Sequence, residues 1–221
     1  MAVEIVTIDT PSLGDRGYLA TDGTVALVVD PQRDHDRVLE AAEALGVSIT
    51  HVFETHIHND YVTGGLALAR LTGAEYCVSA ADSVEFERVP VAGGDLVKVG
   101  ELTVRVIGTP GHTYTHLAYG LEHGGTVLAV FTGGSLLNGS TGRTDLLGEE
   151  HKVALARAQH GSARRLASSL PPETVIYPTH GFGSFCSATP TTRSSLFEKW
   201  CCNAPREIFA RSMTREIEVS T

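Results

Sequence analysis

The segment richest in residues that bind metals is "THIHND", from Thr55 to Asp60. His56 and His58 are two residues apart, and in an extended segment side chains with this spacing point to the same side. Asp60 continues the alternation. Two imidazoles and a carboxylate on one side of the chain suit a divalent metal ion. The spacing therefore predicts a metal site that includes His56 and His58.

Further histidines follow other predicted strands. His112 comes after a Thr-Pro-Gly turn in "GTPGHTYTH", and His180 ends "TVIYPTH". Ligand sites of α/β sheets usually form at the carboxyl ends of strands, so we expect these side chains near the first segment. We predict that His112 is a third metal ligand and that His180 contacts the substrate. His116 is left open, either as an ordinary structural histidine or as a hydrogen-bonding support for a ligand.

The segment "FTGGSLLNGSTGRTD" is dense in glycine and follows another predicted strand. Its backbone could therefore approach a ligand closely. It lacks the lysine of a phosphate-binding loop, and no G-x-S-x-G elbow of a serine hydrolase is present in the chain. Arg143 has two readings, as a buried structural partner of Asp145 or as an anion contact in the substrate site, and we predict the second.

The elements that must position these residues can be read from the surrounding pattern. Strands are predicted at residues 3–8, 25–30, 49–55 and 74–80, and helices at 34–46, 64–73 and 149–170. Hairpins are predicted to turn at Gly100–Glu101 and at Gly124–Gly125. A last strand ends at His180. The mixed order favours an α/β (α+β) fold with two sheets covered by helices, and with histidines gathered at one edge.

The composition limits the class of protein and its partners. Hydrophobic residues make up 42% and charged residues 19% of the 221 residues, as in ordinary folded proteins. The net charge of -9 argues against nucleic acid as a main partner. No apolar run is long enough to cross a membrane, and no signal peptide begins the chain. The four cysteines have no CxxC spacing, so we expect reduced thiols and a cytoplasmic location.

Taken in order, "THIHND", "GTPGHT", "FTGGSLL" and "YPTHG" resemble the motifs of the metallo-β-lactamase superfamily. The resemblance runs from about Val3 to Ser187. It implies a four-layer αβ/βα sandwich with a metal ion at one edge of the paired sheets. We therefore expect a metallo-β-lactamase-like domain at 1–187 and a C-terminal tail at 188–221, with no rhodanese domain.

Within the superfamily, "THIHNDYVTGG", "GRTDLLG" and "PTHGFGSFCSA" are most similar to the persulfide dioxygenase branch, whose domains are often fused to a rhodanese domain. This resemblance implies oxidation of a low-molecular-weight persulfide to sulfite with O₂ and non-haem iron. The glyoxalase II branch is the nearest relative by motif and implies a zinc-dependent hydrolase of a thioester or lactone as the alternative. A third reading is a metal-poor binding protein that has lost catalysis.

The chain departs from the superfamily pattern at Tyr61, where the motif has a histidine, and at Gly134, where it has a metal-binding aspartate. These departures imply one divalent metal ion on His56, His58 and His112, with Fe(II) favoured and Zn(II) as the alternative. Asp60 and Tyr61 are then the expected catalytic residues, as a base or orienting group and as a hydrogen-bond donor. The expected partners are a small-molecule thiol or persulfide and a separate sulfurtransferase, and a homodimer is left open.

Overall fold

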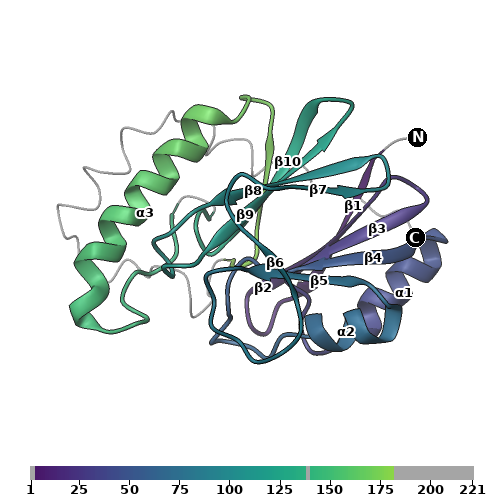
Figure 1. Ribbon diagram of the computed structural model, residues 1–221, viewed down its shortest axis with the longest axis horizontal. Helices are drawn as coiled ribbons and strands as arrows, with labels where there is room; N and C mark the ends of the chain where they lie inside the picture. The colour runs from purple at the N-terminus through teal and green to yellow at the C-terminus, as the bar shows by residue number, and fades with distance from the viewer. Residues whose placement is uncertain (1–2, 138–139, 182–221) are drawn as a thin grey trace.

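The computed structural model describes residues 3–137 and 140–181. Within them, a six-stranded and a five-stranded sheet face each other, and helices cover their outer faces (Figure 1). This is the layered sandwich that the motifs implied. The tail predicted at 188–221, and the end of the domain predicted at 1–187, lie outside the described residues.

The six-stranded sheet has the order β1-β2-β3-β4-β5-β6. β1 and β2 pair antiparallel, as do β2 and β3. The pairings from β3 through β6 are parallel. The strands are β1 (Glu4–Thr10), β2 (Asp15–Thr21), β3 (Val25–Val29), β4 (Ser48–Phe53), β5 (Glu75–Ser79) and β6 (Val89–Val91). The helices that pack on its outer face are α1 (Asp36–Leu45) and α2 (Gly65–Thr72).

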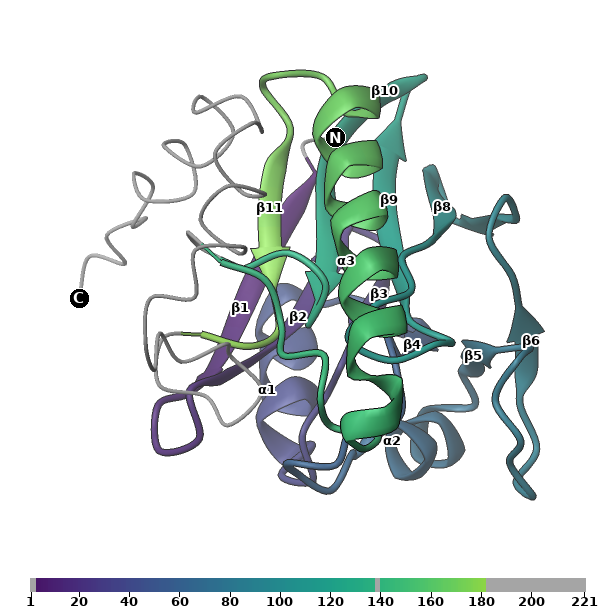
Figure 2. The same ribbon diagram turned by 90° about the vertical axis from the view of Figure 1, so that its left-hand side faces the viewer.

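The five-stranded sheet has the order β11-β10-β9-β8-β7, and only β10 and β11 are parallel. Its strands are β7 (Leu96–Val99), β8 (Leu102–Gly108), β9 (Leu117–His123), β10 (Thr126–Gly133) and β11 (Val175–Pro178). The long helix α3 (Glu149–Ser169) runs across this sheet (Figure 2). Gln159 of α3 donates to the Ser135 carbonyl, and Ser162 donates to the Pro110 carbonyl at 2.7 Å. These bonds attach α3 to the loops that follow β10 and β8.

Residues of β3 show how the sequence builds two cores at once. Leu27 and Val29 are fully buried in the core between the two sheets. Ala26 and Val28 are fully buried on the opposite face, where they pack with Val38 of α1. Successive side chains of a strand point to opposite faces, so a strand covered on both sides needs apolar residues at every position.

The predicted hairpin turns at Gly100–Glu101 and Gly124–Gly125 are confirmed, because they join β7 to β8 and β9 to β10. The helix predicted at 149–170 is α3, which continues through Gly161. Two strands were missed. β2 begins with Asp, Arg and Gly, and β6 has only three residues with a central proline, so neither carries the β-branched run by which strands are recognised.

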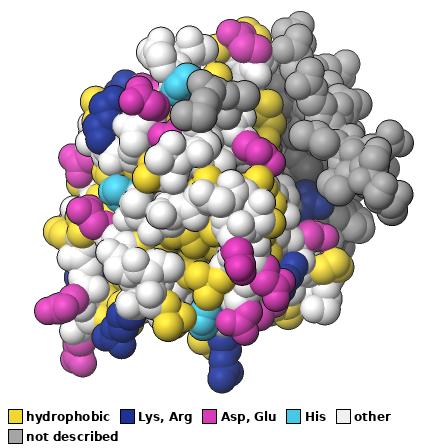
Figure 3. All heavy atoms as spheres, turned by 90° about the vertical axis from the view of Figure 1, so that its right-hand side faces the viewer, with side chains coloured by type: hydrophobic (Ala, Val, Ile, Leu, Met, Phe, Trp, Pro, Cys, Tyr) yellow, Lys and Arg dark blue, Asp and Glu magenta, His cyan; other side chains and the backbone are white. Residues whose placement is uncertain are grey.

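The surface of the described residues carries mixed charge. On the face shown in Figure 3, acidic and basic side chains are interspersed. No helix among the described residues is long and apolar enough to cross a membrane. The exclusion of nucleic acid as a partner stays a prediction from the net charge of -9.

Candidate metal centre

Histidines from three separate segments meet at one edge of the paired sheets. His56 follows β4, His112 follows β8 and His180 follows β11. The ring centroid of His56 lies 4.9 Å from that of His112 and 5.5 Å from that of His180. All three residues are buried, and ligand atoms from the three rings lie within 4.8 Å of one another. We refer to these three residues as the histidine cluster.

His56 is held by hydrogen bonds that begin at the buried carboxylate of Asp30. The Thr55 hydroxyl donates to Asp30 Oδ2 at 2.7 Å and lies 2.9 Å from His56 Nδ1. Because the hydroxyl proton goes to Asp30, Nδ1 of His56 must be the donor in the second contact. Nε2 is then unprotonated, and it is buried without a hydrogen-bond partner among the described residues. This nitrogen can bind a metal ion.

The other rings of the histidine cluster are oriented in the same way. His112 donates through Nδ1 to the backbone carbonyl of Arg143 at 2.8 Å. His180 Nδ1 lies 2.9 Å from Oδ1 of the buried Asp15. An acceptor at Nδ1 fixes the tautomer and directs Nε2 to the opposite side, which is the arrangement typical of histidines that bind metals.

His58 lies between two buried carboxylates. Its Nε2 is 3.2 Å from Asp30 Oδ1 and 3.5 Å from Glu54 Oε2, and these three side chains form a close group of their own. Burial by itself lowers the pKa of His58, but the two carboxylates outweigh burial and raise the pKa to about 10. The other ring nitrogen, Nδ1, lies 3.9 Å from Asp60 Oδ1. His58 is therefore anchored through Nε2 and presents Nδ1 to Asp60.

The three predicted metal ligands lie at the same edge, but their ligand atoms do not form one close set. His56 and His112 share such a set with His180, whereas His58 shares one with Asp60 and His180. The ligand set of His56, His58 and His112 therefore stays a prediction. The structure places His180, predicted to contact substrate, among the candidate ligands as well.

Asp60 is a further buried carboxylate beside this centre. Its side chain is only 4% exposed, and its Oδ2 lies 3.3 Å from His180 Nδ1. Neither carboxylate oxygen has a hydrogen-bond partner among the described residues. A buried carboxylate is costly unless a cation compensates it, and the protonated ring of His58 lies 3.9 Å away. The position of Asp60 fits either a metal ligand or the predicted base.

Burial keeps the imidazoles of His56 and His112 neutral. Burial lowers the pKa of His112 to about 4, and the neighbouring His180 adds to the effect. Burial and then the neighbouring His58 hold the pKa of His56 well below its ordinary value. Because a metal ion binds the unprotonated imidazole, both rings are in the binding form at neutral pH.

The backbones of Gly134 and Gly142 clamp the ring of His112. A Cβ atom at Gly134 would lie 2.8 Å from His112 Nε2 and closer still to Cδ2, and one at Gly142 would lie 2.7 Å from Nδ1. The Gly142 N–H donates to the Gly134 carbonyl at 2.8 Å, which fixes the two backbones to each other. With the backbone in this position, residue 134 has no room for any side chain, so glycine is required for the close approach.

His116 supports this clamp and is not a ligand candidate. Its Nδ1 lies 2.8 Å from Thr109 Oγ1, and its Nε2 accepts the Gly134 N–H at 3.1 Å. Both ring nitrogens are therefore occupied. Of the two readings of His116, the structure favours the supporting role, exerted on His112 through the backbone of Gly134.

Tyr61 packs on the other predicted ligand, His58. The two ring centroids are 4.3 Å apart, and the Tyr61 hydroxyl donates to the Asp30 carbonyl at 3.4 Å. Burial raises the pKa of Tyr61 well above its ordinary value, so the phenol stays protonated. The structure thus gives Tyr61 a packing contact, and its predicted catalytic role stays a prediction.

The side chain of Arg143 forms an ion pair. Its Nε donates to Asp145 Oδ1 at 2.6 Å, and this hydrogen bond holds the pKa of Asp145 below its ordinary value. The expected pair of Arg143 and Asp145 is present, but with side chains 32% and 28% exposed it is not buried. The contact of Arg143 with substrate stays a prediction. The backbone carbonyl of Arg143 has the further role of orienting His112.

Sequence reasoning missed the acidic residues behind the histidines. Asp30 follows β3 with a positive φ of 50°, accepts the Thr55 N–H at 2.7 Å and contacts His58. Glu54 directly follows β4 and accepts a hydrogen bond from Tyr76 at 3.0 Å. The available signal was an acid at the carboxyl end of an apolar strand, the position that also pointed to the histidines.

These features define a four-layer sandwich protein with a candidate metal centre of histidine and aspartate at one edge of its sheets. The chain belongs to the metallo-beta-lactamase superfamily, whose family model matches residues 17–180.

The proteins similar to this chain include a hydroxyacylglutathione hydrolase, a metallo-beta-lactamase and ETHE1. A hydroxyacylglutathione hydrolase of Cereibacter sphaeroides is 37% identical over 191 residues, which are 83% of this chain and 69% of that protein. A crystal structure of a metallo-beta-lactamase from Staphylococcus aureus has a TM-score of 0.77 and 26% identity, and covers 97% of this chain and 67% of that one. ETHE1 from Myxococcus xanthus has a TM-score of 0.74 and 29% identity, and covers 96% of this chain and 90% of that one.

Proposed function

We propose that this chain is a metal-dependent hydrolase of a glutathione thioester or a related small thioester. The observation that carries the proposal is the convergence of His56, His112 and His180, each with an acceptor at Nδ1 and Nε2 directed away from it. The similarity to a hydroxyacylglutathione hydrolase, at 37% identity over 83% of the chain, supports the thioester as the substrate class.

The residues fit a single divalent ion. The histidine cluster would hold it, and Asp60 beside His180 is a further candidate ligand. Neutral imidazoles suit Zn(II) and Fe(II). When bound, such an ion acts as a Lewis acid and makes water more acidic. A second ion has fewer ligands available, because residue 134 is a glycine and Tyr61 directs its hydroxyl to the Asp30 carbonyl.

Asp60 is suited to move the proton in the reaction. Hydrolysis adds one water to the thioester and releases a carboxylic acid and a thiol. In this proposal Asp60 takes a proton from the attacking water and returns it to the sulfur of the departing thiol. The Asp60 oxygens accept no hydrogen bond from the described residues, and the rings of His58 and His180 lie 3.9 Å and 3.3 Å from them.

Thiol release from S-lactoylglutathione tests the proposal. Protein reconstituted with Zn(II), and separately with Fe(II), is expected to hydrolyse the thioester. The variant His56→Ala should lose at least about a hundredfold in kcat/KM, because it removes a cluster ligand. His123→Ala, at the far end of β9, is the matched control and should keep the activity. Absence of turnover by both metal-loaded forms of the wild-type chain would refute the proposal.

The second candidate is an iron-dependent persulfide dioxygenase. The motif resemblance favours it, and so does the similarity to ETHE1, which extends over 96% of this chain and 90% of that protein. The reaction would convert a glutathione persulfide, O₂ and water to glutathione, sulfite and two protons. O₂ uptake by the iron-loaded chain with glutathione persulfide, without hydrolysis of S-lactoylglutathione, would replace the first proposal with this one.

A further inference from the structure

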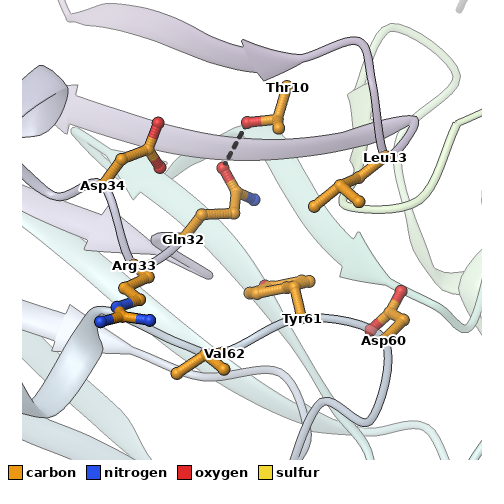
Figure 4. Close-up of a pocket in the computed structure, with 8 residues that line it drawn as sticks. All are labelled: Thr10, Leu13, Gln32, Arg33, Asp34, Asp60, Tyr61 and Val62. Atoms are coloured by element: carbon orange, nitrogen blue, oxygen red, sulfur yellow. Dashed lines mark hydrogen bonds between the residues drawn. The ribbon is translucent and has the colours of Figure 1, made fainter.

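A cavity of about 520 Å³ lies beside the candidate metal centre. Its lining comes from the end of β1, the β1–β2 turn, the segment after β3 and the loop after His58: Thr10, Leu13, Gln32, Arg33, Asp34, Asp60, Tyr61 and Val62. Thr10 and Leu13 lie across the cavity from Tyr61 and Asp60 in Figure 4. The volume is in the range of about 300–1,000 Å³ that is typical of small-molecule sites.

The cavity shares two residues with the metal centre. Asp60 lines it and also lies 3.3 Å from His180. Tyr61 lines it and stacks on His58 with 4.3 Å between ring centroids. A molecule in the cavity would therefore contact two side chains that themselves contact His58 and His180.

Arg33 supplies the positive charge of the lining. Its guanidinium makes no hydrogen bond or ion pair with any residue in the described part of the chain, although its carbonyl contacts His35 Nδ1 at 3.0 Å. The acid next to it, Asp34, is already paired with Arg37 at 3.0 Å. Arg33 is exposed, so its guanidinium is available to an anion bound in the cavity.

The remainder of the lining is a mixture of apolar and fixed polar surface. The exposed fractions of Leu13 and Val62 are 42% and 66%, which are high for large apolar side chains. Thr10 donates to Gln32 Oε1 at 3.0 Å, a bond that is drawn in Figure 4. A pocket of this kind matches an organic molecule that has an uncharged body and at least one anionic group.

We propose that this cavity binds the thiol part of the substrate through a carboxylate that contacts Arg33. The inference rests on the proposed function and narrows its substrate class to derivatives of small thiols that bear a free carboxylate, of which glutathione is one. The planar guanidinium can donate two parallel hydrogen bonds to a carboxylate. The apolar side chains of Leu13 and Val62 would contact the uncharged part of the same molecule.

Calorimetric binding of S-methylglutathione and of its dimethyl ester to the full chain tests the inference. The wild-type chain is expected to bind the acid more tightly than the ester. Arg33→Gln should weaken binding of the acid about tenfold and leave the ester unchanged, because only the acid can accept a charge-assisted hydrogen bond. Arg70→Gln, at an exposed arginine of α2, is the matched control and should leave both affinities unchanged.

A second pair of variants tests the location independently. Val62→Asp places a negative charge in the lining at an exposed position and should weaken binding of the acid. Val153→Asp makes the same change on α3, where Val153 is 60% exposed, and should leave binding unchanged.

The inference is overturned if the wild-type chain does not bind S-methylglutathione, or if Arg33→Gln binds the acid as tightly as the wild-type chain does. It is also overturned if the control variants lose as much affinity as the variants of the lining. Failure of the proposed function has a different signature. In that case no thioester is hydrolysed, yet S-methylglutathione still binds and Arg33→Gln still weakens its binding.

Discussion

At the scale of single residues, the centre depends on which nitrogen of each imidazole is already occupied. Thr55 contacts His56 at Nδ1, the Arg143 carbonyl contacts His112 at Nδ1, and Asp15 contacts His180 at Nδ1. These contacts come from different parts of the chain, yet each of them directs Nε2 of its ring to the opposite side. Orientation by a second hydrogen bond commonly changes metal affinity by about 10–100-fold.

Gly134 provides a direct test of this orientation. A methyl group at this position would overlap the ring of His112, which Gly142 also approaches near Nδ1. Gly134→Ala should therefore displace the ring and weaken metal binding at least tenfold. The measurement is a titration of the metal-depleted variant with Zn(II) in competition with a chromophoric chelator.

Gly108→Ala is the control for that titration, since a Cβ atom at Gly108 would have no neighbour within 4 Å. It should bind Zn(II) like the wild-type chain. Equal affinities for Gly134→Ala and the wild-type chain would show that the glycine clamp does not position His112.

The residues of the centre differ in how far the sequence could predict them. His56 and His112 could be predicted because each follows a strand, and His56 also lies in a His-x-His-x-Asp segment. Asp30 could not, because its role depends on the pairing of β3 with β4, which brings the two strand ends together. His180 was predicted to contact substrate and not to bind the metal. Its closeness to His56 results from the fold and could not be read from the spacing of the two residues in the sequence.

At the scale of elements, one acidic side chain connects turns from the two sheets. Asp22, between β2 and β3, accepts the N–H groups of Thr24 at 2.9 Å and Val25 at 3.0 Å through Oδ1. Its Oδ2 accepts the N–H of Glu101, in the β7–β8 turn, at 2.9 Å. Because these donors belong to both turns, Asp22 fixes the end of the sandwich remote from the histidine cluster.

Removal of this connection should destabilise the fold in a pH-dependent way. Burial tends to raise the pKa of Asp22, but the backbone donors outweigh it, so the pKa lies below its ordinary value. Its stabilisation is thus complete above the unfolded-state pKa of about 4 and is lost as the pH falls through the lower folded-state pKa. Asp22→Ala should lower the free energy of unfolding by about 1–3 kcal/mol at pH 7.

Urea unfolding of Asp22→Ala and the wild-type chain at pH 7 and at pH 3 checks this prediction. The difference between the two proteins should shrink at the lower pH. A difference that is equal at both pH values would mean that the charge of Asp22 does not contribute.

Among the elements, too, local signals could be predicted from the sequence, whereas strands that depend on pairing could not. The β7–β8 and β9–β10 hairpins could be predicted because Gly100 and Gly124–Gly125 mark their turns, with positive φ at each glycine. The strand β2 could not, since its segment "DRGYLAT" has no β-branched run before its last residue. It is a strand because it pairs with β1 and β3 on its two sides.

At the scale of the whole molecule, the sandwich brings four loop segments to one edge and leaves a cavity beside them. The superfamily could be predicted from four ordered motifs, because their order and strand-end positions are specific. The substrate could not, since the motifs resemble the persulfide dioxygenase branch whereas a close relative in sequence is a hydroxyacylglutathione hydrolase. Under the proposals above, that choice depends on the metal and on the side chains of the cavity, including Arg33.

The central claim is that this chain holds one metal ion on its histidine cluster. Elemental analysis of protein expressed in medium supplemented with zinc and iron, and purified without chelators, tests it most directly. The account predicts close to one zinc or iron ion per wild-type chain, and almost none in His56→Ala. Two ions per chain, a far smaller content than one, or an unchanged content in His56→Ala would contradict it.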